Sequence, residues 1–286
     1  MQRKLCIDSF HARVTQEGDE AKVYRAVGGQ RLRNLDPIVL FDDTDTTEGQ
    51  YPDHPHRGFD SVGYVLQGRI LHEDCTGEKG AVDEGGLAWM TSGKGVVHAE
   101  RLDAKHVEVV TVWVNLKSSL KMCEPQYQEF TATALSSVQD MGAGVQVRIL
   151  AGTALGVSAP TISRTPTLFA DFHLTPGAEI SQPIPPGWNS LVYILEGSIN
   201  AGTGQLGPKH VAVFSKDGDT LQLHAETASR VLLLAGQPLN EPCVQYGPFV
   251  MSSRAQILQA YEDFHLGRNG FERAQTWRSS LFSPLC

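Results

Sequence analysis

The chain has 286 residues, of which 24 are Lys or Arg and 32 are Asp or Glu, so its formal net charge at pH 7 is −8. Hydrophobic residues make up 41% and charged residues 20%, which is typical of a soluble globular protein, and the length suits two domains. The sequence is acidic and has no Lys/Arg cluster, which argues against nucleic-acid binding. It also has no apolar run of about 18 residues, which argues against a membrane span.

The five cysteines are widely spaced and include no C-x-x-C pair: Cys6, Cys75, Cys123, Cys243 and Cys286. This pattern favours reduced thiols over a disulfide framework or a zinc site. The N-terminal residues also lack the apolar segment of a secretory signal. We therefore expect a cytoplasmic and nuclear protein, and we expect it to be a monomer.

The predicted elements begin with a weakly alternating strand over residues 21–27, followed by a turn and a buried strand over residues 37–41. Residues 61–66 have the pattern of a further strand, which ends at a Gln-Gly turn. Residues 107–116 are a long β-branched run and predict a core strand. Short strands separated by glycines are typical of a small antiparallel barrel.

Between these strands lie two pairs of metal-binding side chains, each with a spacing of two residues. His54 and His56 form the first pair, and His98 and Glu100 form the second. Residues two apart in an extended strand point to the same face. If the two strands are neighbours, three imidazoles and one carboxylate converge on a single point. Isolated histidine pairs are commonly ordinary surface or core residues, but the two pairs together favour a metal site.

The second half of the chain repeats the first. Residues 64–70, YVLQGRI, match residues 193–199, YILEGSI, and the same offset places residues 58–61 opposite residues 187–190. Self-similarity of this kind marks an internal repeat and predicts a second barrel.

We predict that the second barrel binds no metal. In the register of the repeat, His54 stands opposite Pro183 and His56 opposite Pro185, and proline has no ligating group. The letters H-A-E recur at residues 224–226, but two ligands without the preceding histidine pair make a poor site. We expect these two side chains on a solvated strand face.

The predicted domains are a metal-binding domain over residues 1–133 and a C-terminal domain without metal ligands over residues 143–286. A stretch rich in Ala, Ser, Thr and Gly at residues 131–144 is the expected linker. Apolar residues at helical spacing predict a helix ahead of Gly267 and a second short helical piece after it. These residues are Ile257, Leu258, Tyr261 and Phe264, then Phe271, Ala274 and Trp277.

Eight motifs are spread over nearly the whole chain: residues 52–59, 89–91, 93–95, 98–100, 164–167, 182–185, 247–251 and 269–272. Together they resemble the pirin family of the cupin superfamily. The resemblance implies an all-β bicupin, with two antiparallel β-barrel (jelly-roll) domains and a short C-terminal helical segment. The general cupin pattern places an acidic ligand shortly after H-x-H, here Asp60, whereas pirin-like proteins use the carboxylate of H-x-E. The implied metal ligands are therefore His54, His56, His98 and Glu100, with Asp60 in a supporting role.

The same resemblance implies non-haem Fe(II), which Mn, Co, Ni or Cu could replace, and quercetin 2,3-dioxygenase activity. In that reaction a flavonol is cleaved with O₂ and carbon monoxide is released. Four ligands would fill tetrahedral zinc but leave two positions open on an octahedral metal. Glu100 is the carboxylate that could accept the flavonol proton, and it is our candidate catalytic residue. Phe59, Trp89 and Met90, the bulky apolar residues nearest the ligands, would line or support the pocket unless they are simply barrel core.

The resemblance also implies an alternative function. Pirin-like proteins of animals are iron-dependent co-regulators of NF-κB-type transcription factors. Oxidation of Fe(II) to Fe(III) would raise the charge of the site and could change its affinity for a partner protein. Because the surface is acidic, such a role would require a protein partner rather than direct contact with DNA. The sequence is compatible with both functions.

Overall fold

The computed structural model describes residues 2–17, 21–47, 49–140 and 142–282. The chain forms two compact units. The first unit comprises Val14–Asn34, Ile38–Ala132 and Leu239–Cys286, and the second comprises Met1–Arg13, Leu35–Pro37 and Thr133–Pro238. Among the predicted features, Cys286 lies outside the described residues.

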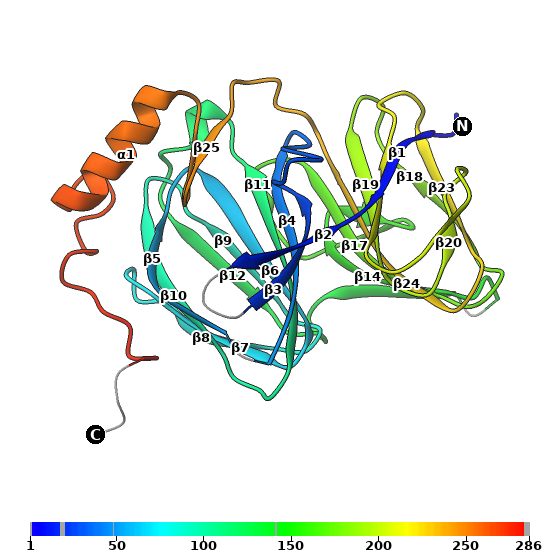
Figure 1. Cartoon of the computed structure of the whole chain (residues 1–286), viewed down its shortest axis with the longest axis horizontal. Helices are drawn as coiled ribbons and strands as arrows, with labels where there is room; N and C mark the ends of the chain where they lie inside the picture. The colour runs from blue at the N-terminus through cyan, green and yellow to red at the C-terminus, as the bar shows by residue number, and fades with distance from the viewer. Residues whose placement is uncertain (1, 18–20, 48, 141, 283–286) are drawn as a thin grey trace. The chain divides into compact units, whose positions relative to one another are not determined.

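The first unit contains a seven-stranded and a four-stranded sheet, both antiparallel (Figure 1). The larger sheet has the order β12 (Gln126–Phe130), β9 (Leu87–Thr91), β6 (Phe59–Gln67), β11 (Val107–Asn115), β4 (Ile38–Thr46), β3 (Ala21–Val27) and β2 (Arg13–Glu17). The smaller sheet has the order β5 (Gln50–His56), β10 (Val96–Leu102), β7 (Arg69–Asp74) and β8 (Lys79–Asp83). The remaining elements are the 3₁₀ turn η1 (Ser118–Leu120), the hairpin β25 (Val244–Tyr246) and β26 (Phe249–Met251), and helix α1 (Arg254–Leu266).

The second unit has the same pair of sheets. Its seven-stranded sheet has the order β1 (Cys6–His11), β22 (His210–Phe214), β19 (Asn189–Glu196), β24 (Ser229–Gly236), β17 (Thr167–Leu174), β14 (Val145–Ala151) and β13 (Ser136–Asp140). Its four-stranded sheet has the order β18 (Glu179–Pro183), β23 (Thr220–Ala225), β20 (Ile199–Asn200) and β21 (Gln205–Leu206). A short hairpin pairs β15 (Thr153–Ala154) with β16 (Val157–Ser158). The two units thus share one strand order, which confirms the predicted all-β fold built from a repeat.

The turn glycines explain why the repeat is visible in the sequence. Gly68 follows β6 and Gly197 follows β19, and both have a positive φ, 86° and 75°. A side chain there would be strained, and its Cβ would collide with the carbonyl oxygens of His106 and Ala228. Glycine is therefore required at the same place in both units.

The two terminal segments belong to other units than the predicted domain ranges gave: the N-terminal segment belongs to the second unit and the C-terminal segment to the first. Strand β1 joins the edge of the sheet in the second unit, in the place that β12 occupies in the first (Figure 1). The buried ammonium group of Lys4 fixes this segment by donating hydrogen bonds to the carbonyl oxygens of Trp188, Ser215 and Lys216, at 2.9 to 3.3 Å. Conversely, Leu239–Cys286 belongs to the first unit. The expected linker over residues 131–144 contains strand β13, which pairs with β14 of the second unit.

Helix α1 begins at the N-cap Ser253, whose side chain accepts a hydrogen bond from the Gln256 N–H, and ends at Gly267 in the left-handed conformation. The helix was predicted, but Leu258 is 70% exposed, and Ile257, Ala260 and Asp263 form the buried face instead. The prediction of a second helical piece is wrong, because residues 271–277 form turns.

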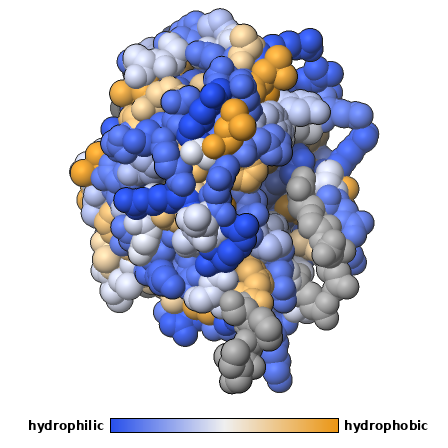
Figure 2. Space-filling model, turned by 90° about the vertical axis from the view of Figure 1, so that its left-hand side faces the viewer, coloured by the Kyte–Doolittle hydropathy of each residue, from blue (hydrophilic) through white to orange (hydrophobic). Residues whose placement is uncertain are grey.

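Seen from the side of α1, the surface is mostly hydrophilic, with apolar residues in small separate groups (Figure 2). Within the described residues, no helix is long and apolar enough to cross a membrane.

The segment after α1 binds the smaller sheet of the first unit. Glu73 of β7 accepts hydrogen bonds from Ser279 Oγ and Ser280 N, at 3.0 and 2.7 Å, and pairs with Lys79. Burial alone would raise the pKa of Glu73, but these partners lower it to about 2. The segment after α1 therefore stabilises the sheet that carries the paired histidines.

Candidate metal centre

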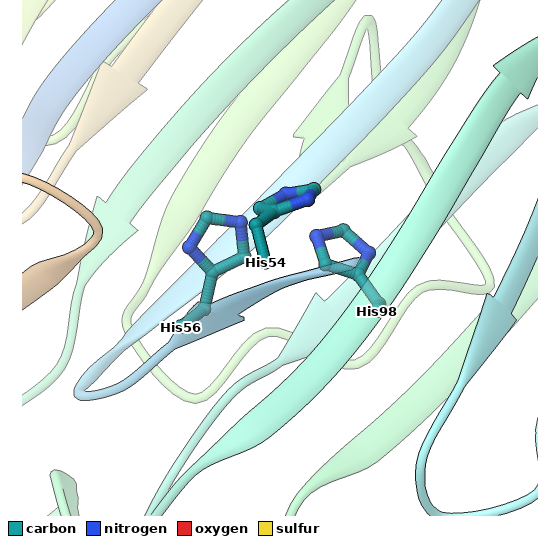
Figure 3. Close-up of side chains that lie close together, drawn as sticks. All are labelled: His54, His56 and His98. Carbon is teal, nitrogen blue, oxygen red and sulfur yellow. The ribbon is translucent and has the colours of Figure 1, made fainter. Parts of the chain in front are cut away.

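The three predicted histidines lie together at one end of the smaller sheet in the first unit (Figure 3). Strands β5 and β10 are antiparallel neighbours, and their register places His98 directly opposite His54. His56 follows His54 on the same face of β5. The ring centroids are 4.2 Å apart for His54 and His98, and 4.8 Å apart for each pair with His56. One ring nitrogen of each residue lies within 4.8 Å of the others, which is close enough to share one metal ion.

The surrounding backbone orients two of the rings. Nδ1 of His54 lies 2.9 Å from the carbonyl oxygen of Pro52, and Nδ1 of His56 lies 3.4 Å from that of Pro248. A carbonyl oxygen only accepts, so each Nδ1 must carry the proton, which leaves the Nε2 lone pair for a ligand. This arrangement is common among metal-binding histidines.

His98 provides the test of whether the site fits a metal. Its side chain is buried, and within the described part of the chain its Nε2 has no hydrogen-bond partner. A buried polar atom without a partner is costly, and a metal ion that accepts the lone pair removes that cost. Burial, together with the neighbouring imidazoles, lowers the pKa of both His56 and His98 well below the usual value of 6.5. Both rings are therefore neutral at pH 7, which is the form that binds metal.

The structure does not bring Glu100 into the same group of donor atoms. Glu100 is half-buried and lines the cavity beside His54 and His56. The side chains whose donor atoms lie within 4.8 Å of one another are those of the three histidines. A β-bulge explains the offset: His98 pairs with His54, whereas Glu100 pairs with Tyr51, so β5 holds one extra residue between these pairs. Spacing alone could not reveal this irregularity.

His54 and His56 line a cavity of about 480 Å³, which is within the size range of small-molecule sites. Its lining is contributed by both sheets of the first unit and by the segment that holds Gln245, Gly247 and Pro248. Trp113 is one aromatic residue of the lining, and its ring centroid lies 5.3 Å from that of His56. The imidazoles of His54 and His56 therefore face a space that a small organic molecule can enter, and His98 lies directly behind them.

The apolar residues expected around the pocket lie behind its wall. Phe59 is fully buried and packs against His56 and Trp113, with ring centroids at 5.1 and 4.2 Å. Trp89 is also buried and donates a hydrogen bond to Asp60 at 3.0 Å, which gives Asp60 a structural role. Met90 belongs to the core cluster beneath α1. These residues support the site but do not line it. The aromatic residues that do line the cavity are Trp113 and Tyr51, and neither was predicted.

Arg57 anchors the end of strand β5, the strand that carries His54 and His56. Its guanidinium, with the side chain only 1% exposed, donates to Asp263 Oδ2 at 2.9 Å, to the Lys94 carbonyl at 2.7 Å and to the Asn269 carbonyl at 2.8 Å. It also lies 4.7 Å from the ring centroid of Phe271. Arg57 follows His56 directly, so α1 and the turns after it hold the ligand strand in place. This contribution could not be predicted from the sequence, because Asp263 is about two hundred residues away along the chain.

The second unit differs at each corresponding position. By the register of the repeat, Pro183 of β18 replaces His54, and its partner across the strand pair is Thr220 rather than a histidine. His224 lies opposite Glu179, four residues farther along β23, and its side chain is 42% exposed. The second H-A-E motif therefore has the same letters as the first but a different place in the fold.

Two jelly-roll units, one with a buried histidine cluster facing a cavity, define a bicupin. The chain belongs to the pirin family: the pirin model matches residues 20–114, and the model of the pirin C-terminal cupin domain matches residues 169–270. Human pirin is 43% identical over 282 residues, and the alignment covers 96% of both chains. A pirin-like protein of Solanum lycopersicum is 41% identical with the same coverage.

Solved structures give the same fold. The crystal structure of quercetin 2,3-dioxygenase from Acinetobacter baumannii is 32% identical with a TM-score of 0.87, and the match covers 94% of this chain and 99% of that one. The bacterial pirin YhhW from Escherichia coli, solved in complex with nickel(II), is 18% identical with a TM-score of 0.65, and the match covers 79% of this chain and 96% of that one. At that identity the second likeness concerns the fold alone.

Proposed function

We propose that this protein is a quercetin 2,3-dioxygenase-type oxidoreductase, which cleaves a flavonol with O₂ and releases carbon monoxide. The observation that carries the proposal is the buried Nε2 of His98, which has no hydrogen-bond partner in the described part of the chain and lies beside two oriented imidazoles at the wall of a cavity. The likeness to a quercetin 2,3-dioxygenase at 32% identity supports the same activity.

The proposed metal is Fe(II), held by His54, His56 and His98. Glu100 lies outside the histidine group but lines the same cavity, and we propose it as the fourth ligand. Such an ion supplies open coordination positions for an oxygen-donor substrate and for O₂. Three neutral imidazoles and one carboxylate leave a divalent centre with a charge of +1. A flavonol that has lost its 3-hydroxyl proton is an anion and suits this charge.

The protein side chains perform the steps that surround the oxidation. The apolar residues of the cavity wall, including Trp113, exclude water and hold a flat aromatic molecule against the histidines. Glu100 lines the same cavity, and we assign it the 3-hydroxyl proton of the substrate. The carbonyl oxygens of Pro52 and Pro248 keep His54 and His56 in the tautomer that the site needs.

We expect iron-loaded protein to consume quercetin and O₂ together in an aerobic assay that follows the flavonol absorption band and released carbon monoxide. Metal-free protein should be inactive. Glu100→Gln should lose about 100-fold or more in kcat, because it keeps the shape of the side chain but cannot accept the proton. Metal content measured on the same samples separates loss of the base from loss of the ion.

The opposite result would favour the alternative function. If no metal form cleaved the flavonol, while Fe(III) but not Fe(II) protein retained an NF-κB-type transcription factor in a pull-down, a redox-dependent co-regulator would replace the enzyme. Turnover by the iron-loaded protein alone supports the dioxygenase.

A further inference from the structure

We propose that the cavity contains a second binding subsite, remote from the histidines, which accepts a hydroxylated aromatic ring of the substrate. Four residues form it: Arg25, Asp42, Thr111 and Gly63. This inference rests on the proposed function, because it extends the substrate class to planar phenols of at least two rings.

The four residues form one continuous row across four strands. Arg25 of β3 pairs with Asp42 of β4, Asp42 pairs with Thr111 of β11, and Thr111 pairs with Gly63 of β6. Directly paired residues point to the same face of a sheet, and all four line the cavity. The row therefore lies across the cavity floor.

Two further rows flank it and set its distance from the metal site. One consists of Leu40, Trp113 and Ser61, and the other of Val23, Thr44 and Val109. Trp113 touches His56, so the first of these rows is the one next to the histidines. Rows two residues apart along a strand are separated by about 7 Å. A ligand bound at the histidines thus reaches the Arg25 row only if it extends beyond one ring.

Gly63 provides the space for that ring. It lies in the middle of β6, where glycine weakens a strand, and the register is continuous on both sides of it, so there is no bulge. Among the described residues, and apart from its two chain neighbours, no heavy atom lies within 4 Å of the position that a Cβ of residue 63 would take. The open space and the continuous register at Gly63 suit close approach of a ligand, which is one of the usual reasons for a glycine inside a strand.

The second unit supplies an internal comparison. The row at the same place in the repeat consists of Ile149, Ala170, Leu233 and Val192, in strands β14, β17, β24 and β19. All four are apolar, at most 1% exposed, and part of one continuous core. Val192 therefore fills the space that Gly63 leaves open. The unit with the histidine cluster has an ion pair, a hydroxyl and an open space where the other unit has packed hydrocarbon.

The ion pair determines the chemistry of the ring. Arg25 donates to both carboxylate oxygens of Asp42, at 2.8 and 2.6 Å, and the two side chains are 17% and 8% exposed. A phenolic hydroxyl is both a donor and an acceptor, so it can bind beside a carboxylate and a guanidinium together. A purely apolar ring would gain nothing from this pair and would bury its charges. The subsite therefore selects hydroxylated rings.

The test uses Gly63→Val, which introduces the residue of the second unit, and Gly63→Ala as a graded variant. Protein loaded with Ni(II) is titrated with quercetin and with catechol under anaerobic conditions, so that binding is measured without turnover. We expect the Kd of quercetin to rise at least about tenfold in Gly63→Val and less in Gly63→Ala. The Kd of single-ring catechol and the nickel content should stay unchanged. If Gly63→Val misfolds, Gly63→Ala still gives the quercetin-to-catechol comparison.

Other outcomes separate this inference from the proposed function. Equal quercetin affinity in all three proteins, equal losses for quercetin and catechol, or no quercetin binding by the unsubstituted protein would overturn the subsite. Selective loss of quercetin binding without turnover by the iron-loaded protein would retain the subsite and remove the dioxygenase. Turnover that Gly63→Val leaves unchanged would retain the dioxygenase and remove the subsite.

Discussion

His98→Ala is expected to abolish stoichiometric metal binding. The unsubstituted protein should carry about one transition-metal ion per chain, and the variant should lose more than about 100-fold in affinity, since even residues that only orient a ligand cost 10- to 100-fold. The physical reason is the position of His98, opposite His54 and with a buried Nε2 that has no hydrogen-bond partner among the described residues. Elemental analysis and titration with Co(II) or Ni(II) measure the effect.

Two variants of the second unit serve as controls. His224→Ala removes the histidine of the other H-A-E motif, and Pro185→Ala changes a position that replaces a ligand in the repeat. Both should keep one ion per chain. Excess metal should also raise the melting temperature of the unsubstituted protein but not of His98→Ala, because about 1,000-fold excess over Kd stabilises a folded protein by about 4 kcal/mol. Metal retained by His98→Ala and lost by His224→Ala would place the site in the second unit.

Asp263→Ala is expected to destabilise the first unit by about 3–5 kcal/mol, the usual cost of leaving one buried charge without its partner. Arg57 and Asp263 are 1% and 2% exposed, and their atoms lie 2.9 Å apart. Denaturant unfolding at pH 7 measures the loss. The matched control is Glu262→Ala, which removes the neighbouring carboxylate on the solvent side of α1. Its pair with Arg268 is about half exposed, so the change should be below about 1 kcal/mol.

The same ion pair predicts how stability depends on pH. Burial alone would raise the pKa of Asp263, but hydrogen bonds from Arg57, Asn269, Gln259 and Arg268 lower it from 3.8 to about 2. Because the folded state lowers the pKa, the stabilisation is complete above pH 4 and is lost as the pH falls toward 2. Its size is about 2–3 kcal/mol. Asp263→Ala should therefore show a shallower loss of stability between pH 4 and pH 2, and equal slopes in both proteins would contradict this assignment.

The sequence by itself determined the local patterns of this protein. Two pairs of ligands at a spacing of two, on strands, identified His54, His56 and His98 as one cluster, because alternation in a strand is a property of consecutive residues. The repeat gave the two-unit architecture, since Gly68 and Gly197 are required by the same turn. The single α-helix of the described residues also followed from its periodicity and its terminal glycine.

Only the tertiary structure decided which distant residues meet. The bulge that offsets Glu100, the exchange of β1 and the C-terminal segment between the units, and the bond between Arg57 and Asp263 all depend on pairings far apart in the chain. The row that contains Gly63 is assembled from four strands and has no signature in any one of them. Local periodicity constrains each strand independently, whereas strand order and register depend on the packing of the whole unit, and no short stretch of sequence contains that information.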